Sequence, residues 1–338
     1  MNIFMLSENI VVHSFYTAYN FLKFEQILFM KKIQMVDLQS QYYKIKADVD
    51  NAVLNVMDSA AFINGPEVKF FQSELESYLD VKNVIPCANG TDALQIALMA
   101  LGLKEGDEVI TADFTFAATV EVIHLLKLKA VLVDVDYDTF TLDPVKLKAA
   151  ITPATKAIIP VHLFGQCANM EEILKIAKDH HLFVVEDDAQ AIGAEFTFAD
   201  GSVKKSGTMG IIGTTSFFPS KNLGCYGDGG ALFTNDDELA HKIRGIVNHG
   251  MYERYYHDEV GLNSRLDSIQ AAVLRKKLPL LDSYSEARRK AADYYDEAFA
   301  GHPHVLTPKR AEHSTHVFHQ YTLRILNGKR NELQQFLA

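Results

Sequence analysis

The chain has 338 residues, of which 48% are hydrophobic and 22% charged, as in an ordinary soluble protein with one large α/β domain and a smaller one. The formal net charge of -10 argues against a nucleic-acid-binding protein, which needs a basic face to neutralise phosphates. It does not exclude an anionic small substrate, because one arginine in a pocket can dominate the local charge.

Residues 1–33 are predicted to be an extension outside the folded core. Charged residues interrupt their apolar stretch, so no run reaches the roughly 20 residues of a membrane helix. The segment also lacks the basic start and small-residue cleavage site of a signal peptide. We interpret it as upstream sequence translated from a misplaced start, with Met30 or Met35 as the working start. A partner-binding amphipathic arm is the alternative.

The cysteines Cys87, Cys167 and Cys225 are few and odd in number, which does not fit a disulfide framework. No close Cys/His pair has the spacing of a zinc site, so no metal is expected. We therefore predict reduced thiols in a cytoplasmic protein that binds neither nucleic acid nor membrane.

Short apolar runs rich in valine and isoleucine predict strands that are covered on both faces. These runs lie at 84–85, 108–111, 130–135, 157–161 and 183–185. Stretches with helical spacing lie between them, at 91–101, 116–126, 144–150 and 170–180. Repeated strand–helix–strand units imply an α/β fold with a mainly parallel sheet, right-handed crossovers and helices on both faces.

The pattern changes in the second half of the chain. The later elements are predicted as strands at 214–218 and 230–234, a helix at 236–247, a long helical region at 267–299 bent near Pro279, and a strand at 316–325. We assign residues 34–285 to a large α/β domain and residues 286–338 to a small C-terminal domain. One strand and the start of a helix are too little for an independent domain, so we expect this second domain to be truncated.

Lys221, in the segment SFFPSKNLG, leaves an apolar strand and enters a turn rich in glycine and asparagine. Burying an ammonium group is costly, so lysines usually avoid such places. A buried lysine with a lowered pKa is what Schiff-base chemistry requires. For an isolated lysine, however, a surface position on a turn is the better interpretation.

Three acids, Glu186, Asp187 and Asp188, follow the strand predicted at 183–185. A carboxylate at the carboxyl end of a parallel strand lies where ligands bind in open α/β sheets. In this position it can keep the pyridine nitrogen of a cofactor protonated, which strengthens the ring as an electron sink. An acid that stabilises a helix N-terminus explains this segment equally well when it is taken alone.

The segment CANGTDAL places Gly90 and Thr91 where a strand gives way to a helix. Free backbone N–H groups at a helix start bind phosphate. A plain helix cap by Asn89 or Thr91 is the safer interpretation of this turn alone. The order of the three elements along a parallel α/β chain, helix start, strand-end aspartate and strand-end lysine, is a much stronger signal.

From about Gln34 to its end, the sequence resembles the sugar-nucleotide aminotransferases of the DegT/DnrJ/EryC1/StrS type. These have the aspartate-aminotransferase-like fold, fold type I of the pyridoxal-phosphate-dependent transferases, with a smaller C-terminal domain. The segments that carry the resemblance are MVDLQSQY, INGPEV, CANGTDAL, DFTFAATVE, PVHLFGQ, EDDAQAIGA, SFFPSKNLG, GDGGALFTN and GLNSRLDSIQAA.

The resemblance implies pyridoxal 5'-phosphate as the cofactor. Lys221 is similar to the lysine that carries it and that shuttles a proton between the substrate and cofactor carbons. Asp187 is similar to the acid that pairs with the pyridinium nitrogen, and Gln190 to the residue that contacts the ring hydroxyl. Phe116 matches the aromatic residue that stacks on the cofactor ring.

The resemblance further implies that Gly90, Thr91 and Ser216 bind the cofactor phosphate. Asn263 resembles the residue that reaches this phosphate from the neighbouring subunit, which implies a homodimer with shared active sites. Asp188 departs from the family, which often has a small residue there; neighbours on an extended chain face opposite sides, so we expect it to point away. The loop 193–213 is longer than usual and is predicted to be a surface hairpin.

The implied reaction is a transamination in two half-reactions. An amino acid, expected to be glutamate, gives its amino group to the cofactor and leaves as the 2-oxo acid. The amino group then passes to the ketone of a nucleotide-linked sugar. Relatives that dehydrate sugars have a histidine at the lysine position, so Lys221 favours amino transfer.

The motifs are most similar to those of the branch that acts on UDP-2-acetamido-2-deoxy-3-oxo-glucuronate, for surface polysaccharides such as O-antigen. Arg265 is the candidate to bind the sugar carboxylate. It could instead be an ion-pair partner of Asp267, and motif matches carry a false-positive risk. An NDP-4-keto-6-deoxy-hexose, which lacks the carboxylate, is the alternative substrate.

Two other classes of function stay open. The first is an inactive cofactor-binding fragment or regulator, which the short C-terminal part motivates. The second is a nicotinamide-dependent enzyme on a doubly wound sheet. The lack of a G-x-G-x-x-G turn after an early strand counts against the second class.

Overall fold

The computed structural model describes residue 34 and residues 36–337, so the extension predicted at 1–33 lies outside the described residues. The chain divides after Tyr43, and the large fold is that of the unit Lys44–Ala338. Helix α2 (Leu38–Ser59) crosses this division. Whether residues 286–338 form a separate small domain stays a prediction.

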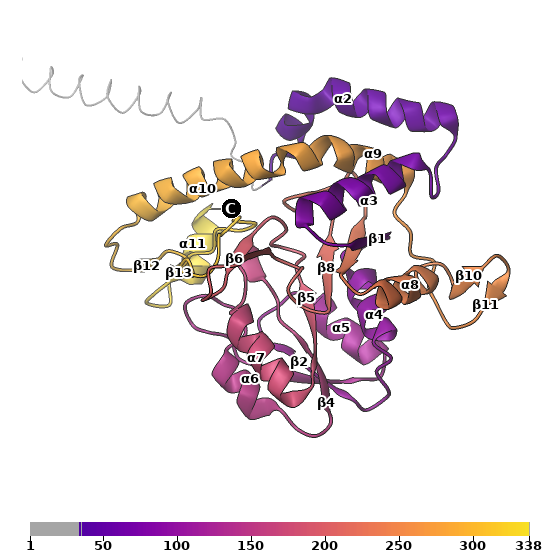
Figure 1. The fold of residues 1–338 in the computed structure, drawn as a ribbon. Helices are drawn as coiled ribbons and strands as arrows, with labels where there is room; N and C mark the ends of the chain where they lie inside the picture. The colour runs from indigo at the N-terminus through magenta and orange to yellow at the C-terminus, as the bar shows by residue number, and fades with distance from the viewer. Residues whose placement is uncertain (1–33, 35, 338) are drawn as a thin grey trace, which may run out of the picture. The chain divides into compact units, whose positions relative to one another are not determined.

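The central feature of this unit is a sheet of seven strands among the described residues, in the order β1-β9-β8-β5-β4-β2-β3 (Figure 1). Its strands are β1 (Asn83–Cys87), β2 (Glu108–Ala112), β3 (Lys129–Val133), β4 (Thr155–Ile159), β5 (Phe183–Asp187), β8 (Ile212–Ser216) and β9 (Gly230–Thr234). Strand β9 is antiparallel to both of its neighbours, and the remaining pairings are parallel. The predicted α/β class with a mainly parallel sheet is confirmed.

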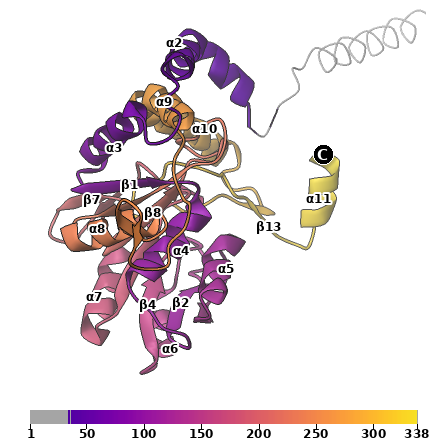
Figure 2. The same ribbon diagram turned by 90° about the vertical axis from the view of Figure 1, so that its right-hand side faces the viewer.

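Helices cover both faces of the sheet (Figure 2) because successive strand residues face opposite sides. The covering helices are α4 (Gly90–Ala100), α5 (Ala117–Leu125), α6 (Pro144–Ala150), α7 (Met170–His180) and α8 (Asp237–Ile246). Val109 and Val185 pack in one hydrophobic cluster with α4, α5 and α8. Their neighbours Ile110 and Val184 pack in another cluster with α6 and α7. This alternation fixes the sheet between two helical layers.

A third hydrophobic cluster joins the β1–β9 side of the sheet to α3 (Pro66–Leu79), α9 (Ser268–Lys277) and α10 (Leu281–Ala298). A short 3-10 turn, Leu278–Leu280, separates α9 from α10, so the predicted bend near Pro279 is confirmed. Figure 1 shows α9 and α10 following one another along this side. Helix α10 runs across the predicted border at position 285.

The prediction of a strand at 316–325 is wrong, because only β13 (Arg324–Ile325) is a strand there, paired with β12 (Val305–Leu306). Phe318 has a left-handed backbone with φ of 46°, which interrupts an extended run. The Val317 N–H donates instead to the carbonyl of Gly165, in the 3-10 turn η1 (Leu163–Gly165). The segment therefore follows this turn and does not extend a sheet.

The remaining elements are β6 (Glu195–Thr197), β7 (Val203–Lys205), β10 (Met251–Glu253), β11 (Tyr256–His257) and α11 (Arg330–Leu337). Strands β6 and β7 pair antiparallel, as the hairpin predicted for the loop 193–213 requires. Among residue 34 and residues 36–337, no helix has both the length and the apolar character needed to span a bilayer.

Candidate active site

The predicted site segments meet at the carboxyl edge of the sheet. Strand β1 ends at Cys87, β5 at Asp187 and β8 at Ser216, and these strands run in one direction. Gly230, the first residue of the antiparallel strand β9, pairs with both Cys87 and Ser216. The helix start at Gly90 therefore lies beside the end of β8, as the ligand-binding edge of an open α/β sheet requires.

Lys221 lies in a turn that is held by backbone hydrogen bonds between its own residues. Its N–H donates to the carbonyl of Phe218 at 2.8 Å, and the N–H of Cys225 returns to the carbonyl of Phe217 at 2.8 Å. Burial lowers the pKa of the Lys221 ammonium, while the charge of Asp187 acts in the opposite direction. The lysine is thus half-buried and within electrostatic reach of the predicted acid, as Schiff-base chemistry needs.

Two residues outside the predicted set hold this turn. Asn222 Nδ2 donates to the carbonyl of Val317 at 3.0 Å, and Lys277 Nζ donates to the carbonyl of Gly224 at 2.7 Å. Lys277 is itself buried, and this burial lowers its pKa to about 8. The turn that carries Lys221 is therefore fixed from α9 and from the segment around Val317.

Asp187 is buried at the end of β5, and its carboxylate has defined partners. Thr119 Oγ1 donates to its Oδ2 at 2.8 Å, and the Ala189 N–H donates to its Oδ1 at 3.2 Å. Thr119 lies on α5, one turn after Phe116, and also shares a hydrogen bond with Thr115. Sequence reasoning missed Thr119, although its place in DFTFAATVE, one turn from a predicted site residue, was a usable signal.

Glu186 supports the site from inside the protein. Its Oε2 accepts a hydrogen bond from His162 Nε2 at 2.8 Å, and both side chains are fully buried. The other imidazole nitrogen, Nδ1, accepts from the Ala168 N–H at 3.1 Å, so the ring is the neutral Nε2–H tautomer. Glu186 also accepts the N–H groups of Gly207 and Met209, and so fixes the turn before β8.

Asp188 is completely buried, and neither of its carboxyl oxygens has a hydrogen-bond partner among the described residues. The nearby hydroxyl of Ser206 donates to the carbonyl of Ala191 at 2.8 Å and is therefore occupied. Burial raises the pKa of Asp188 to about 8, and the charges of Glu186 and Asp187 act in the same direction. Asp188 is therefore a neutral carboxylic acid near pH 7.

The helix start at Gly90 and Thr91 has the geometry of an anion site. Asn89 caps the helix by accepting the Asp92 N–H at 2.8 Å, and the first helical bond runs from Ala93 N. Within the described part of the chain, this leaves the N–H groups of Gly90 and Thr91 without an acceptor.

Gly90 also allows the helix start to approach β8. A Cβ on Gly90 would lie 2.7 Å from the Cβ of Ser216, so only a glycine fits between the two segments. The Ser216 hydroxyl is thus next to the free N–H groups of the helix. The binding of a phosphate by these residues stays a prediction.

Gln190 and Phe116 occupy two further positions at this edge. Gln190 Oε1 accepts the Phe164 N–H at 2.8 Å, which orients the amide so that its NH2 group is the free end. Phe116 precedes α5 and is 67% exposed, so its ring is open for stacking. Their contacts with a cofactor stay predictions.

The segment around Asn263 and Arg265 is attached to the helix start through Ser264, whose Oγ accepts the Ala88 N–H at 3.1 Å. Asn263 is exposed, as a residue that reaches a neighbouring subunit must be. Arg265 is half-buried and makes no ion pair with any described residue, including Asp267. The ion-pair interpretation of Arg265 therefore has no support in the structure, and its role in substrate binding stays a prediction.

His319 is a further residue that sequence reasoning missed. Burial lowers its pKa to about 3, and the charges of Lys221 and Arg288 act in the same direction, so the imidazole is neutral. Its Nδ1 is buried without a hydrogen-bond partner among the residues described. The residue lies in the segment predicted as a strand, and no local pattern related it to Lys221.

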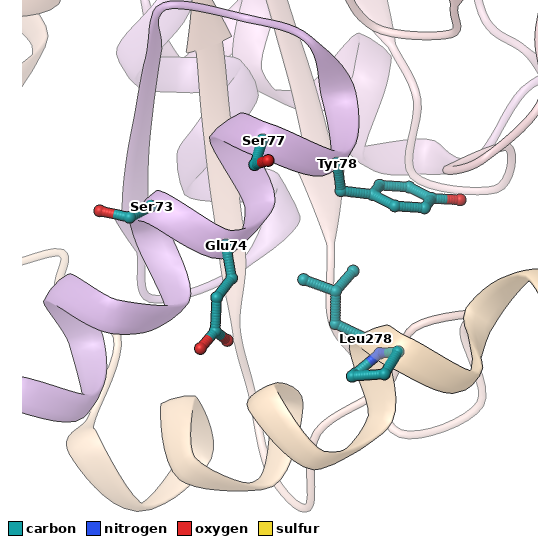
Figure 3. A pocket seen from close by; sticks show the side chains of 6 residues that line it. Ser73, Glu74, Ser77, Tyr78 and Leu278 are labelled. Carbon is teal, nitrogen blue, oxygen red and sulfur yellow. The ribbon is translucent and has the colours of Figure 1, made fainter.

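A separate hollow of about 480 Å³ lies between α3 and the turn that joins α9 to α10 (Figure 3). It is lined by Ser73, Glu74, Ser77, Tyr78, Leu278 and Pro279. None of the predicted site residues belongs to this lining. In the described part of the chain, no group of three or more His, Cys, Asp or Glu side chains is arranged to hold a metal ion.

Known proteins resemble this chain over most of its length. A pleiotropic regulatory protein of Geobacillus stearothermophilus is 50% identical over 307 residues, which cover 90% of this chain and 81% of that protein. The UDP-2-acetamido-2-deoxy-3-oxo-D-glucuronate aminotransferase of Pseudomonas aeruginosa is 48% identical over 295 residues, covering 87% and 80%. The crystal structure of DesV from S. venezuelae with a ketimine intermediate has a TM-score of 0.86 at 38% identity, covering 91% and 82%.

The DegT/DnrJ/EryC1/StrS aminotransferase family matches residues 43–338, which is most of the chain. The predicted resemblance, the predicted fold class and the prediction of an aminotransferase are confirmed by this match and by the relatives. The chain belongs to the DegT/DnrJ/EryC1/StrS aminotransferase family.

Proposed function

We propose that this protein transfers an amino group from glutamate to UDP-2-acetamido-2-deoxy-3-oxo-glucuronate, with pyridoxal 5'-phosphate as cofactor. Membership of an aminotransferase family and the 48% identical enzyme of P. aeruginosa support the reaction and the substrate class. The observation that carries the proposal is the half-buried Lys221, whose pKa is lowered by burial and which lies within reach of the charge of Asp187.

The residues at the carboxyl edge fit this cofactor. The unused N–H groups of Gly90 and Thr91, next to Ser216, offer donors for a phosphate. The buried carboxylate of Asp187 offers an acceptor for a protonated ring nitrogen. Lys221 lies in the turn that follows β8, and β8 lies between β1 and β5 in the sheet. One anion site, one acid and one lysine match the three functional groups of pyridoxal phosphate.

When it is bound, the cofactor supplies an electron sink that stabilises negative charge on the substrate carbon. The chain supplies positioning and proton transfer. Lys221, with its lowered pKa, accepts a proton on its amine nitrogen and returns it. Asp187 would hold the ring nitrogen, and the hydrogen bond from Thr119 fixes the direction of the carboxylate. The ring of Phe116 is exposed and would be free to stack on one face of the cofactor ring.

The proposal includes a homodimer in the cytoplasm. Asn263 is exposed, while its neighbour Ser264 is bound to Ala88 within the same chain. Successive residues of an extended segment face opposite sides, so Asn263 faces away from its own helix start. In a twofold dimer this residue reaches the phosphate site of the partner subunit. The three buried free cysteines are compatible with a reducing compartment.

Arg265 is proposed to bind the sugar carboxylate. It is half-buried and has no acid partner in the described part of the chain, so its guanidinium is available for a bidentate contact. Loss of activity on the acid sugar in Arg265→Ala, with activity on a neutral keto-sugar retained, supports this role. An equal loss on both substrates contradicts it.

The function is tested by incubating the holoenzyme with glutamate and a panel of keto-sugars linked to UDP or dTDP, and measuring product mass. Amination of the UDP-linked 3-oxo acid sugar supports the proposal. Amination of an NDP-4-keto-6-deoxy-hexose alone assigns the alternative substrate.

The regulatory protein of G. stearothermophilus favours a second candidate, a cofactor-binding regulator. Bound cofactor without turnover of any amino donor supports that candidate.

A further inference from the structure

Three phenylalanine rings, each in contact with the other two, lie at the same edge of the sheet as the cofactor residues. The ring centroids of Phe114, Phe140 and Phe164 are 5.7 to 6.0 Å apart, at tilted or perpendicular angles. The three residues follow β2, β3 and β4, which are parallel neighbours, so their loops lie on the carboxyl side. We call these three rings the aromatic wall.

The aromatic wall is connected directly to the candidate active site. The N–H of Phe164 donates to Oε1 of Gln190, the predicted contact of the cofactor ring hydroxyl. Phe114 lies two residues before Phe116 in the loop that leads into α5, which carries Thr119. The wall is therefore next to the place where the substrate must meet the cofactor.

The loops of the aromatic wall are held in place by side chains from other parts of the chain. Gln166 Nε2 donates to the carbonyls of Thr139 and Lys309 at 3.4 and 3.2 Å, and so ties the Phe140 loop to the segment after η1. Arg324 donates to the carbonyl of Tyr137 at 2.6 Å. The wall is thus preformed, which lowers the cost of ordering it when a ligand binds.

Two of the three residues have an unusual backbone. Phe140 has φ of 59° and Phe164 has φ of 60°, in the left-handed region that bulky residues rarely adopt. Such a conformation is strained and persists only where the surroundings hold it, most often at binding sites. The strained backbone at Phe140 and Phe164 indicates that the orientation of these two rings is held by the surrounding structure.

One ring of the wall is exposed, and two cations next to the wall share one carboxylate. Phe114 is 46% exposed. The guanidinium of Arg324 lies 4.4 Å from the ring of Tyr137 and 5.3 Å from that of Phe140, but it pairs with Asp138. Lys309 pairs with the same carboxylate. The three rings carry no charge, so the exposed Phe114 suits contact with the face of a ring of the substrate.

We propose that an uncharged ring of the nucleotide-sugar substrate packs face-on against Phe114 of the aromatic wall. This inference rests on the proposed function and adds a specificity subsite to it. A pyrimidine base and a pyranose ring both offer a flat or apolar face to an aromatic ring. The contact forms only in the sugar half-reaction, because glutamate has no ring.

The test compares Phe114→Ala with Phe114→Tyr and with Phe183→Ala in the full-length holoenzyme. Phe183 is 42% exposed, but it is the first residue of β5 and therefore lies at the amino ends of the parallel strands, away from the candidate active site. Calorimetry measures binding of UDP-N-acetylglucosamine, a stable analogue, and of UDP alone. We expect Phe114→Ala to weaken analogue binding about tenfold, in the range of a lost stacking contact. Phe114→Tyr and Phe183→Ala keep the affinity of the wild type.

The two ligands distinguish the two rings. If UDP and the analogue weaken equally in Phe114→Ala, the base packs on the wall; if only the analogue weakens, the pyranose does. Unchanged affinity for both overturns the inference, and so does a wild type that binds neither ligand. Dissociation of Phe114→Ala into monomers in light scattering also overturns it, since Phe114 is then a contact between two copies.

The glutamate half-reaction, followed through the absorbance of the cofactor, separates this inference from the proposed function. Phe114→Ala is expected to leave its rate unchanged, and an equal slowing of both half-reactions overturns the subsite. A wild type that binds the analogue but aminates no keto-sugar contradicts the proposed function and leaves the wall supported.

Discussion

Thr119 Oγ1 donates a hydrogen bond to Asp187 Oδ2 at 2.8 Å, and both side chains are buried at the carboxyl edge of the sheet. The bond joins α5 to the end of β5, two elements that the order of the sheet brings to the same edge. It leaves the other carboxylate oxygen to the Ala189 N–H and fixes the plane of the carboxylate. The direction of the predicted pyridinium partner thus depends on a hydroxyl outside the predicted set.

Thr119→Val is expected to slow both half-reactions by about tenfold to a hundredfold, because it removes a hydrogen bond to a charged group and keeps the side-chain shape. Thr119→Ser retains the hydroxyl and is expected to keep most of the activity. Stopped-flow absorbance of the cofactor measures both rates. Equal rates in the valine and serine variants contradict a role for the hydroxyl.

Asp188→Asn is expected to change how stability depends on pH. Burial raises the pKa of Asp188 to about 8, so the folded protein keeps this proton over a range in which the unfolded chain has released it. The free energy of unfolding therefore falls as pH rises from about 4 to about 8, by roughly 1.4 kcal/mol per unit for this one group. Above about pH 8 the contribution of Asp188 is constant.

Urea unfolding of the wild type and of Asp188→Asn at several pH values between about 5 and 8 measures this slope. Because the asparagine does not titrate, the difference between the two slopes isolates Asp188 from the other ionisable groups. We expect the variant to lose less stability than the wild type as pH rises through this window. Parallel pH profiles mean that Asp188 is already ionised at about pH 5, which contradicts a raised pKa for this residue.

Lys277→Met is expected to act in a higher pH window and with the opposite sign. Burial lowers the pKa of Lys277 to about 8, so the folded protein releases this proton before the unfolded chain does. Lys277 therefore adds stability as pH rises from about 8 to about 10, by roughly 1.4 kcal/mol per unit. Lys277→Met removes this rise in urea unfolding, whereas the same change at the exposed Lys276 leaves it. If the free energy of unfolding still rises with pH in Lys277→Met, the rise comes from another group and the prediction is contradicted.

Gly90→Ala is expected to destabilise the protein by about 1–3 kcal/mol, because its Cβ overlaps the Cβ of Ser216 and forces the helix start away from β8. The movement also displaces the free N–H groups, so bound cofactor per chain decreases. Thermal unfolding and cofactor absorbance measure the two effects. The double variant Gly90→Ala with Ser216→Gly removes the overlap and is expected to regain stability; no recovery rules out this contact as the cause.

The sequence was sufficient for the elements that have strong local patterns. Short apolar runs predicted strands such as β2 and β5, since strands covered on both faces are almost continuously apolar. The order of the helix start at Gly90, the strand-end Asp187 and the strand-end Lys221 along the chain indicated one site. In the structure Asp187 lies within electrostatic reach of Lys221, and Gly90 lies against Ser216.

The supporting contacts were not predictable, because they join segments that are far apart in the chain. His319 approaches Lys221 only because the Val317 segment follows the turn at Gly165, and this path depends on the left-handed backbone of Phe318. Local propensity favoured a strand there, and tertiary contacts decided otherwise. The buried Lys277 is likewise placed by the packing of α9.

In the proposed function, Lys221 forms the reducible covalent bond with the aldehyde of pyridoxal phosphate. Borohydride reduction of the cofactor-loaded protein, followed by peptide mass spectrometry, tests it most directly. We predict one cofactor mass on Nζ of Lys221 and none in Lys221→Ala. Attachment to Lys277, the other buried lysine whose pKa burial lowers, or to no lysine at all contradicts this claim.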